Sequence, residues 1–271
     1  MAPKKSRNIK TKAKRVFKSS FELVEVFDQT RFHVFQNFQK FDTLLKYRSI
    51  WGERQVILDE LDPSIRRNLE SKGWLPLCHD LIPPLATLVR EFYLNLSIQF
   101  DSSSGHILTA WIQGEEFKIT KQIVSETFGM PLVCRPTYPC TKSLHIDDVM
   151  TLLYGRSITW GTEPRLKSCE LKEYNYMLFR IACYNLFPIS HVHTNPIDRC
   201  VFLYALSTDG PIYFPSSFIQ TIVAIHRSKS RKHCLFFPVF ISKVLAYLVL
   251  KDFLASNSVH LTAPIGSSFL R

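Results

Sequence analysis

Apolar residues recur at helical spacing along most of the chain. An early stripe consists of four phenylalanines, each three residues after the last: Phe32, Phe35, Phe38 and Phe41. A clearer stripe follows Pro83-Pro84 and consists of five residues on one helical face: Leu85, Leu88, Val89, Phe92 and Leu96. This spacing is typical of amphipathic helices, so we predict a mainly helical fold. The helix after Pro83-Pro84 is expected to end near residues 101–105, where polar residues and a glycine gather.

Local start and stop signals define further helices. Four starts are predicted from a capping residue or a proline, and they fall at Asp62-Pro63, Thr120, Ser143 and Asn195-Pro196. Three glycines predict where helices stop: Gly73, Gly129 and Gly155. Together with the apolar runs, these signals place helices over residues 64–72, 120–128, 143–154, 170–187, 196–206, 216–225 and 238–250.

One segment has the pattern of a β-hairpin instead. Residues 106–112 and 117–119 are rich in β-formers and flank Gln113-Gly114-Glu115-Glu116, which reads as a turn. No repeat period and no clean linker interrupt residues 30–250. We therefore expect a single helical globular domain over residues 30–250 with one short β-hairpin, followed by an irregular C-terminal tail over residues 251–271.

The net charge of +11 is concentrated near the start of the chain. Residues 1–18 contain no Asp or Glu and eight cations: Lys4, Lys5, Arg7, Lys10, Lys12, Lys14, Arg15 and Lys18. Subtracting these eight from the 34 Lys and Arg of the chain leaves 26, against 23 Asp and Glu. We therefore expect the positive field to belong mainly to this segment, with no comparable excess in the body.

Residues 1–20 are polar, basic and without periodicity, so they cannot bury enough apolar surface to offset chain entropy. They are predicted to form a disordered basic arm. Eight cations on such an arm would release counterions from phosphates, which favours salt-sensitive, sequence-independent contact with nucleic acid. Lys12-Ala13-Lys14-Arg15 also fits a nuclear import signal, so a nuclear location is expected, with a cytoplasmic one as the alternative. A terminus that serves only solubility explains the same residues equally well.

The cysteines and the hydrophobic stretches indicate whether the chain has the patterns of a disulfide-rich, secreted or membrane protein. The chain has an odd number of cysteines, seven, and Cys183 and Cys200 lie within apolar runs, so reduced and mostly buried thiols are favoured over a disulfide framework. No apolar region follows the first basic residues, so no signal peptide is expected. The most hydrophobic stretch, residues 234–250, contains Pro238 and Lys243 and is shorter than the ~20 residues of a spanning helix. We expect a buried helix there and no membrane partner.

Several short motifs occur in an order found in a plant protein family. Residues 48–54 read RSIWGER and residues 89–96 read VREFYLNL. Three shorter motifs follow in the same order: Phe128-Gly129-Met130-Pro131, Phe187-Pro188 and Phe236-Phe237-Pro238. Through these motifs, residues 30–250 resemble the family of putative plant transposon proteins. The resemblance implies an origin in a plant mobile element, and it carries over no catalytic residue, cofactor or metal.

Patterns that would indicate catalysis are weak. A transposase of the nuclease type needs about three carboxylates around two metal ions. Asp147-Asp148 is the one adjacent acidic pair of interest, and its place in a first helical turn is explained by the helix dipole. Thr208-Asp209-Gly210 lacks the residue order of the Asp-Thr-Gly core of retroviral-type aspartic proteases and favours a simple turn. No catalytic residue is predicted.

The histidines and cysteines have no spacing that defines a zinc site. The candidates are His191, His193, His226, His233-Cys234 and the pair Cys134 and Cys140. We therefore predict no metal and no cofactor. The early phenylalanine stripe could stack on bases, but aromatic residues at helical spacing favour a place in the core.

Taken together, these patterns favour a non-catalytic binding or assembly module derived from a plant mobile element. Its arm would contact nucleic acid, and its protein partners are unknown. Two alternatives stay open, namely a degenerate transposase or nuclease-type enzyme and an inert reading frame left by the element. The enzyme would require acidic side chains clustered in one pocket with shifted pKa values.

Overall fold

A computed structural model describes most of the chain between Asp28 and Ile265. The described residues are 28, 30–103, 105–131, 133–134, 136, 138, 144–156, 166–189, 193–248 and 262–265. The predicted basic arm, residues 1–20, lies outside them, as does most of the predicted C-terminal tail.

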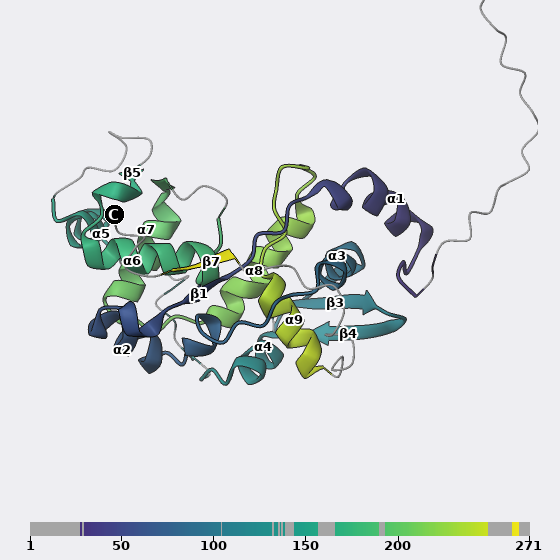
Figure 1. Ribbon diagram of the computed structural model, residues 1–271, viewed down its shortest axis with the longest axis horizontal. Helices are drawn as coiled ribbons and strands as arrows, with labels where there is room; N and C mark the ends of the chain where they lie inside the picture. Colours follow the sequence, from purple (N-terminus) through teal and green to yellow (C-terminus); the bar gives the residue numbers. More distant parts are fainter. Residues whose placement is uncertain are drawn as a thin grey trace, which may run out of the picture.

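Nine α-helices dominate this described part of the chain (Figure 1). The helices are α1 (Phe35–Thr43), α2 (Pro63–Ser71), α3 (Ala86–Leu94), α4 (Lys121–Phe128), α5 (Ile146–Tyr154), α6 (Glu173–Ile181), α7 (Ile197–Ser207), α8 (Phe214–Arg227) and α9 (Pro238–Tyr247). Short 3-10 turns are η1 (Leu45–Tyr47), η2 (Leu58–Glu60), η3 (Leu75–Leu77) and η4 (Ser168–Glu170), and a π-helical turn, η5 (Ala182–Leu186), continues α6. The prediction of a mainly helical fold is confirmed.

The strands form one small sheet and two short pairs. They are β1 (Arg54–Val56), β2 (Leu96–Asp101), β3 (Gly105–Ile112), β4 (Glu115–Ile119), β5 (Leu166–Lys167), β6 (Thr194–Asn195) and β7 (Thr262–Ile265). The sheet is antiparallel in the order β2-β3-β4, while β1 pairs with β7 in parallel and β5 with β6 antiparallel. The predicted hairpin is thus the β3–β4 pair of a three-stranded sheet.

The segment after α3 corrects the prediction of one long helix. The helix ends at Leu94, and residues 96–101 form strand β2, with Leu96 opposite Ala110 of β3. Leu96 fits both the spacing of a helix and the alternation of a strand. It lies four residues after Phe92, and it also begins an alternation of apolar and polar residues. Pairing with β3 satisfies the backbone groups of β2, so tertiary contact decides between the two periods.

Most helix ends follow their local signals. The Asp62 carboxylate accepts a hydrogen bond from the Ser64 backbone N–H at 2.7 Å, and the Thr120 hydroxyl accepts one from the N–H of Ile123 at 3.3 Å. Gly129 and Gly155 end α4 and α5 with φ angles of 65° and 72°, which only glycine adopts without strain.

Two predicted helix starts are displaced. Helix α5 begins at Ile146 with His145 at its N-cap, so the predicted cap at Ser143 is wrong. The N-terminal charge of α5 comes from Asp147 and Asp148 in its first turn, and these favour the positive end of the helix dipole. Pro196 is itself the N-cap residue of α7, one position earlier in the helix than predicted.

Helix α8 crosses the middle of the molecule (Figure 1). Helices α5, α6 and α7 gather on one side of it, and the sheet, α1 and α3 lie on the other. Its rings meet those at the start of α9: the ring of Phe218 lies 4.9 Å from that of Phe237, the N-cap residue of α9, and the ring of Phe214 lies 5.8 Å from that of Phe240. The expectation of a buried helix over residues 238–250 is confirmed for α9, and none of the described helices is long and apolar enough to cross a bilayer.

The early phenylalanine stripe belongs mainly to the core. Phe32 is buried, and its ring lies 5.4 Å from that of Phe38 and 5.8 Å from that of Phe41. Phe35 is the exception among these described residues, with 42% of its surface exposed. Packing of the stripe on the core is therefore favoured over base stacking.

The described cysteines are thiols that are not in disulfides. Cys78, Cys183 and Cys200 are buried, and burial raises the pKa of each thiol to about 12. Cys134 and Cys169 are exposed, so only part of the expectation of buried thiols holds.

A short segment before β1 connects the facing ends of α8 and α9. The Arg48 guanidinium, 3% exposed, donates hydrogen bonds to the carbonyls of Ile225, Ser228 and Ser230, at 3.3, 2.5 and 3.1 Å. It therefore places a cation at the negative end of the α8 dipole. Each of its three nitrogens thus has a carbonyl partner, as a buried charge requires.

Glu53, five residues later, places an acidic group at the N-terminal end of α9. Its carboxylate is 1% exposed and accepts hydrogen bonds from the backbone N–H groups of Val239 and Phe240, each at 3.0 Å. Between Arg48 and Glu53 the backbone pairs with Leu235, whose N–H donates to Ser49 at 2.8 Å. We call residues 48–53 the clamp, because they hold both ends of the loop between α8 and α9.

The clamp carboxyl generates a pH prediction. Burial raises the pKa of Glu53 from 4.5 to about 7, so the folded protein binds this proton more tightly than the unfolded chain. The stability that this group contributes is complete below pH 4.5 and is lost as the pH rises through about 7. The shift corresponds to a loss on the order of 3 kcal/mol in the free energy of unfolding.

We expect Glu53→Gln to remove this dependence, as measured by urea denaturation at a series of pH values. Exposed Glu60→Gln is the control and should keep the wild-type slope. Because other groups titrate in the same window, the wild-type curve minus the Glu53→Gln curve isolates the effect. Parallel curves for the wild type and Glu53→Gln would contradict the prediction.

Candidate nucleic-acid interface

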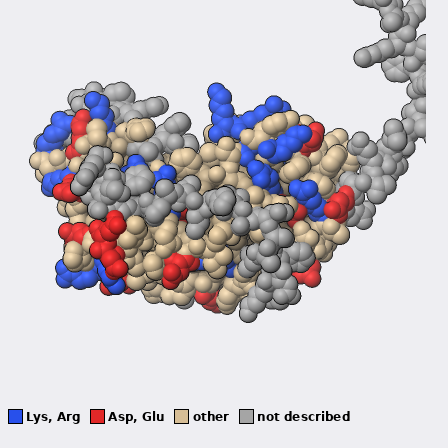
Figure 2. Space-filling view, in the orientation of Figure 1, with Lys and Arg blue, Asp and Glu red and all other residues tan. Residues whose placement is uncertain are grey.

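The structure brings together cations from two segments that lie far apart in the sequence. Lys40 and Lys46 come from α1 and η1, and the others come from the end of α8 and the loop that follows it. We call this surface the basic face, and it consists of Lys40, Lys46, Arg227, Lys229, Arg231 and Lys232. All of them except the half-buried Lys40 are exposed. Figure 2 shows Lys and Arg side chains gathered over α1 and the loop after α8.

Arg48 of the clamp fixes the loop of the basic face. Its bonds to Ser228 and Ser230 join residues on either side of Lys229, although Arg48 and Ser230 are 182 residues apart in the sequence. The loop is also pinned at Leu235, whose carbonyl accepts from the Trp51 N–H at 2.9 Å. The cations of the loop therefore extend from a backbone held at several points.

An exposed aromatic ring lies among these cations. Tyr47 is 59% exposed and directly precedes Arg48. The Lys46 ammonium lies 5.1 Å from the centre of its ring, and the Arg231 guanidinium carbon lies 5.4 Å away. These are cation–π distances, so the ring links the two segments of the basic face.

Few acids oppose this charge. Asp42 pairs with Lys46, and in the described part of the chain no ion pair is found for the other five cations. Burial, with the charge of Arg48 adding to it, lowers the pKa of Lys40. Burial and the charge of Lys40 lower the pKa of His226 to about 4, so this imidazole is neutral at pH 7. Like-charge effects on both groups indicate a positive local potential.

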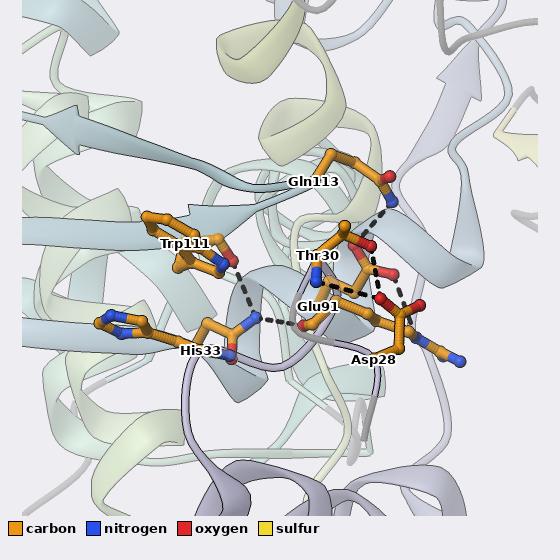
Figure 3. A network of polar contacts seen from close by, with 8 residues as sticks. Asp28, Thr30, His33, Glu91, Trp111 and Gln113 are labelled. Carbon is orange, nitrogen blue, oxygen red and sulfur yellow. Dashed lines mark hydrogen bonds and ion pairs between the residues drawn. The ribbon is translucent and has the colours of Figure 1, made fainter. Parts of the chain in front are cut away.

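A buried carboxylate anchors the chain that leads into α1 (Figure 3). Glu91 of α3 is 1% exposed, and its carboxylate lies 3.1 Å from the Arg31 Nε and accepts a hydrogen bond from the Gln113 side chain at 3.0 Å. Burial raises the pKa of Glu91, and the nearby charge of Arg31 opposes this rise. The pair attaches the segment before α1 to α3 and to the end of β3.

Asn95 completes this attachment. Its side-chain carbonyl accepts from the N–H of His33 at 3.3 Å and from Asn37 at 2.8 Å, and its NH₂ donates to the carbonyls of Arg31 and Trp111, each at 2.8 Å. The His33 ring also stacks on Trp111, with the centroids 4.8 Å apart (Figure 3). Glu91 and Asn95 of the VREFYLNL motif thus position α1, and with it one side of the basic face.

The acidic candidates form no metal centre in the described residues. Asp147 and Asp148 are exposed in the first turn of α5, where the dipole argument places them. Asp209 has a φ of 54° in the turn after α7 and pairs with Lys72. Within the described part of the chain, no group of three or more His, Cys, Asp or Glu side chains could hold a metal ion.

The histidine candidates are dispersed. His226 lies half-buried at the end of α8, and His233 is exposed in the loop. The carbonyl of His193 accepts a hydrogen bond from the Ser168 N–H at 3.1 Å. His191 and Cys140 lie outside the described residues, as do the eight arm cations predicted to contact nucleic acid.

The basic face is a local concentration of cations that the net charge of the whole body does not reveal. Counting charges over the whole body averaged this region with acidic ones elsewhere. A windowed count would have found it, because residues 210–251 contain no Asp or Glu and include the run from His226 to His233. No pattern in the sequence indicates that Lys40 and Lys46 lie near this loop, because their position depends on tertiary contacts.

The fold and the basic face define a mainly helical protein with a cationic surface built on a rigid scaffold. Residues 70–248 match the family model described as "Putative plant retrotransposon-related domain". The match covers more than half of the chain, so the protein belongs to this family, and the resemblance predicted for residues 30–250 is confirmed over residues 70–248. Comparisons with curated proteins and with solved structures gave no match.

Replacing the buried cation of the clamp should loosen the basic face. Arg48→Ala leaves three carbonyls without their charged donor and opens a cavity, so we expect a loss of about 3 kcal/mol or more in the free energy of unfolding. Amide hydrogens of residues 228–235 should also exchange faster than in the wild type. Urea denaturation and hydrogen exchange measure the two effects.

Arg227→Ala is the matched control, because Arg227 is an exposed arginine beside the same helix end. Its effect on stability should stay within about 0.5 kcal/mol. Arg48→Lys should recover only part of the loss, since one ammonium cannot reproduce the guanidinium fork. Equal stabilities of Arg48→Ala and Arg227→Ala would contradict the role of the clamp.

Proposed function

We propose that this protein is a non-catalytic nucleic-acid-binding module derived from a plant retroelement. The observation that carries the proposal is the basic face, in which two segments contribute six cations and one of them, Lys46, pairs with Asp42. Family membership supports the origin in a plant retroelement. Lys and Arg side chains on a shared surface are the usual partners of phosphates.

The physical mechanism is electrostatic. Cations that neutralise phosphates release condensed counterions, so affinity falls steeply as salt rises. Because the clamp holds the loop of the basic face, binding costs less backbone entropy than it would with a free loop. The expected binding is independent of sequence, since contacts to phosphates carry no base information.

The arm and the basic face have complementary parts in this proposal. The eight arm cations would attract nucleic acid from solution and add phosphate contacts without fixing an orientation. The basic face would hold the bound strand in one place. Lys12-Ala13-Lys14-Arg15 would in addition direct nuclear import, which a fluorescent fusion with and without residues 1–18 can test.

The proposal predicts the binding of charge variants. A basic-face variant carries Lys229→Glu, Arg231→Glu and Lys232→Glu, and an arm variant lacks residues 1–18. We expect each variant to weaken binding to labelled nucleic acid, and the combination to remove nearly all of it. The slope of log affinity against log salt should fall by about one for each phosphate that is no longer neutralised. Fluorescence anisotropy in a salt series measures both quantities.

A charge-matched control distinguishes the effect of losing the basic face from the effect of lowering the net charge of the protein. Arg67→Glu, Lys118→Glu and Lys172→Glu reverse three exposed cations on α2, on β4 and at the start of α6. This control should bind nearly as tightly as the wild type. The proposal fails if the control and the basic-face variant lose the same affinity, or if the basic-face variant binds like the wild type.

A further inference from the structure

Tyr47 is an aromatic residue on the basic face whose ring is not packed into the core. Leu45, two residues before it, and Arg48, directly after it, are almost fully buried, at 1% and 3% exposed, while Tyr47 itself is 59% exposed. The buried neighbours fix the backbone of η1, so the ring is presented on a rigid support. An exposed, immobilised ring can receive a flat partner at little entropic cost.

The cations beside the ring add a second element. Lys46 and Arg231 lie within 5.4 Å of the ring centre and come from different segments of the chain. A base placed against the exposed part of the ring would have its own phosphates within reach of these charges. Base stacking on an aromatic ring beside a cationic track is the usual way to hold a single strand.

Duplex nucleic acid fits this arrangement less well. In a duplex the base faces are covered by their neighbours, and only the base edges can be reached through the grooves. Reading those edges requires a helix or a ribbon that enters a groove. The basic face instead presents a helix end, a loop and a flat ring.

We infer that the basic face binds single-stranded nucleic acid, with a base stacked on Tyr47 and the adjoining phosphates held by Lys46 and Arg231. This inference rests on the proposed function and names its substrate class. It also differs from the interpretation of the early phenylalanine stripe, whose rings pack mainly on the core. Stacking is available to any base, so the binding remains independent of sequence.

The test uses the full chain and three labelled probes of equal length. These are oligo(U) RNA, oligo(dT) DNA and a DNA duplex, each followed by fluorescence anisotropy. Tyr47→Ala should weaken binding to both single strands by roughly five- to a hundredfold, the usual effect of removing one stacking ring. Duplex affinity should change less than about threefold. If Tyr47→Ala weakens binding to the RNA and DNA strands equally, the ring contributes base stacking and no contact specific to the sugar. A larger loss with RNA would indicate an added contact to the 2′-hydroxyl.

Two further variants isolate the ring. Tyr47→Phe keeps the aromatic face and should bind single strands within about twofold of the wild type. Tyr247→Ala is the matched control, because Tyr247 is 51% exposed on α9 and lies outside the basic face. It should leave all affinities unchanged. Thermal unfolding of Tyr47→Ala should match the wild type, as expected for an exposed side chain.

Salt dependence separates stacking from charge. Tyr47→Ala should lower affinity at every salt concentration without changing the slope against log salt, whereas the basic-face charge variant should change that slope. Photocrosslinking with a 4-thiouridine strand should label Tyr47 and leave Tyr247 unlabelled.

The outcomes distinguish this inference from the proposed function. If the charge variant loses binding but Tyr47→Ala does not, the basic face binds phosphates and the stacking position is wrong. If Tyr47→Ala weakens strand and duplex equally, the selectivity for single strands is wrong. If the wild type binds none of the probes, the proposed function falls together with the inference.

Discussion

A buried guanidinium and a buried carboxyl at facing helix ends organise this protein. Arg48 satisfies the last carbonyls of α8, and Glu53 satisfies the first amides of α9. Burying either charge without partners would be strongly destabilising. The clamp therefore depends on these particular partners, and the partners depend on the clamp, because helix ends leave these backbone groups unpaired otherwise.

The clamp makes the basic face possible. Like charges repel, and a free loop with Lys229, Arg231 and Lys232 would spread into solvent. Arg48 holds that loop through Ser228 and Ser230, while Glu91 and Asn95 hold the chain leading into α1. The motifs that suggested the family, RSIWGER and VREFYLNL, thus supply the scaffold. The exposed side chains beside them supply the proposed binding surface.

The same contacts account for the buried titratable groups. Glu53 and Glu91 have raised pKa values, a property that also marks catalytic acids. Each has backbone or side-chain partners that explain its position as a structural anchor. The alternative of a degenerate nuclease therefore gains no support from these two carboxyls. The proposal of a binding module relies on the basic face, where charge lies exposed to a partner.

Features that depend on near neighbours could be predicted from the order of amino acids alone. The caps at Asp62 and Thr120 and the stops at Gly129 and Gly155 involve groups within a few residues, so local pattern sufficed. Membership of the family could also be predicted, because its motifs are short and occur in a fixed order along the chain.

Features that join distant segments required the folded chain. The segment Leu96–Asp101 fits either a helix or a strand until β3 pairs with it. Tyr47 meets Arg231, and Arg48 meets Ser230, because folding closes a loop of 182 residues. No local pattern reports such a contact, since its energy exists only once the packed core has brought the two segments together.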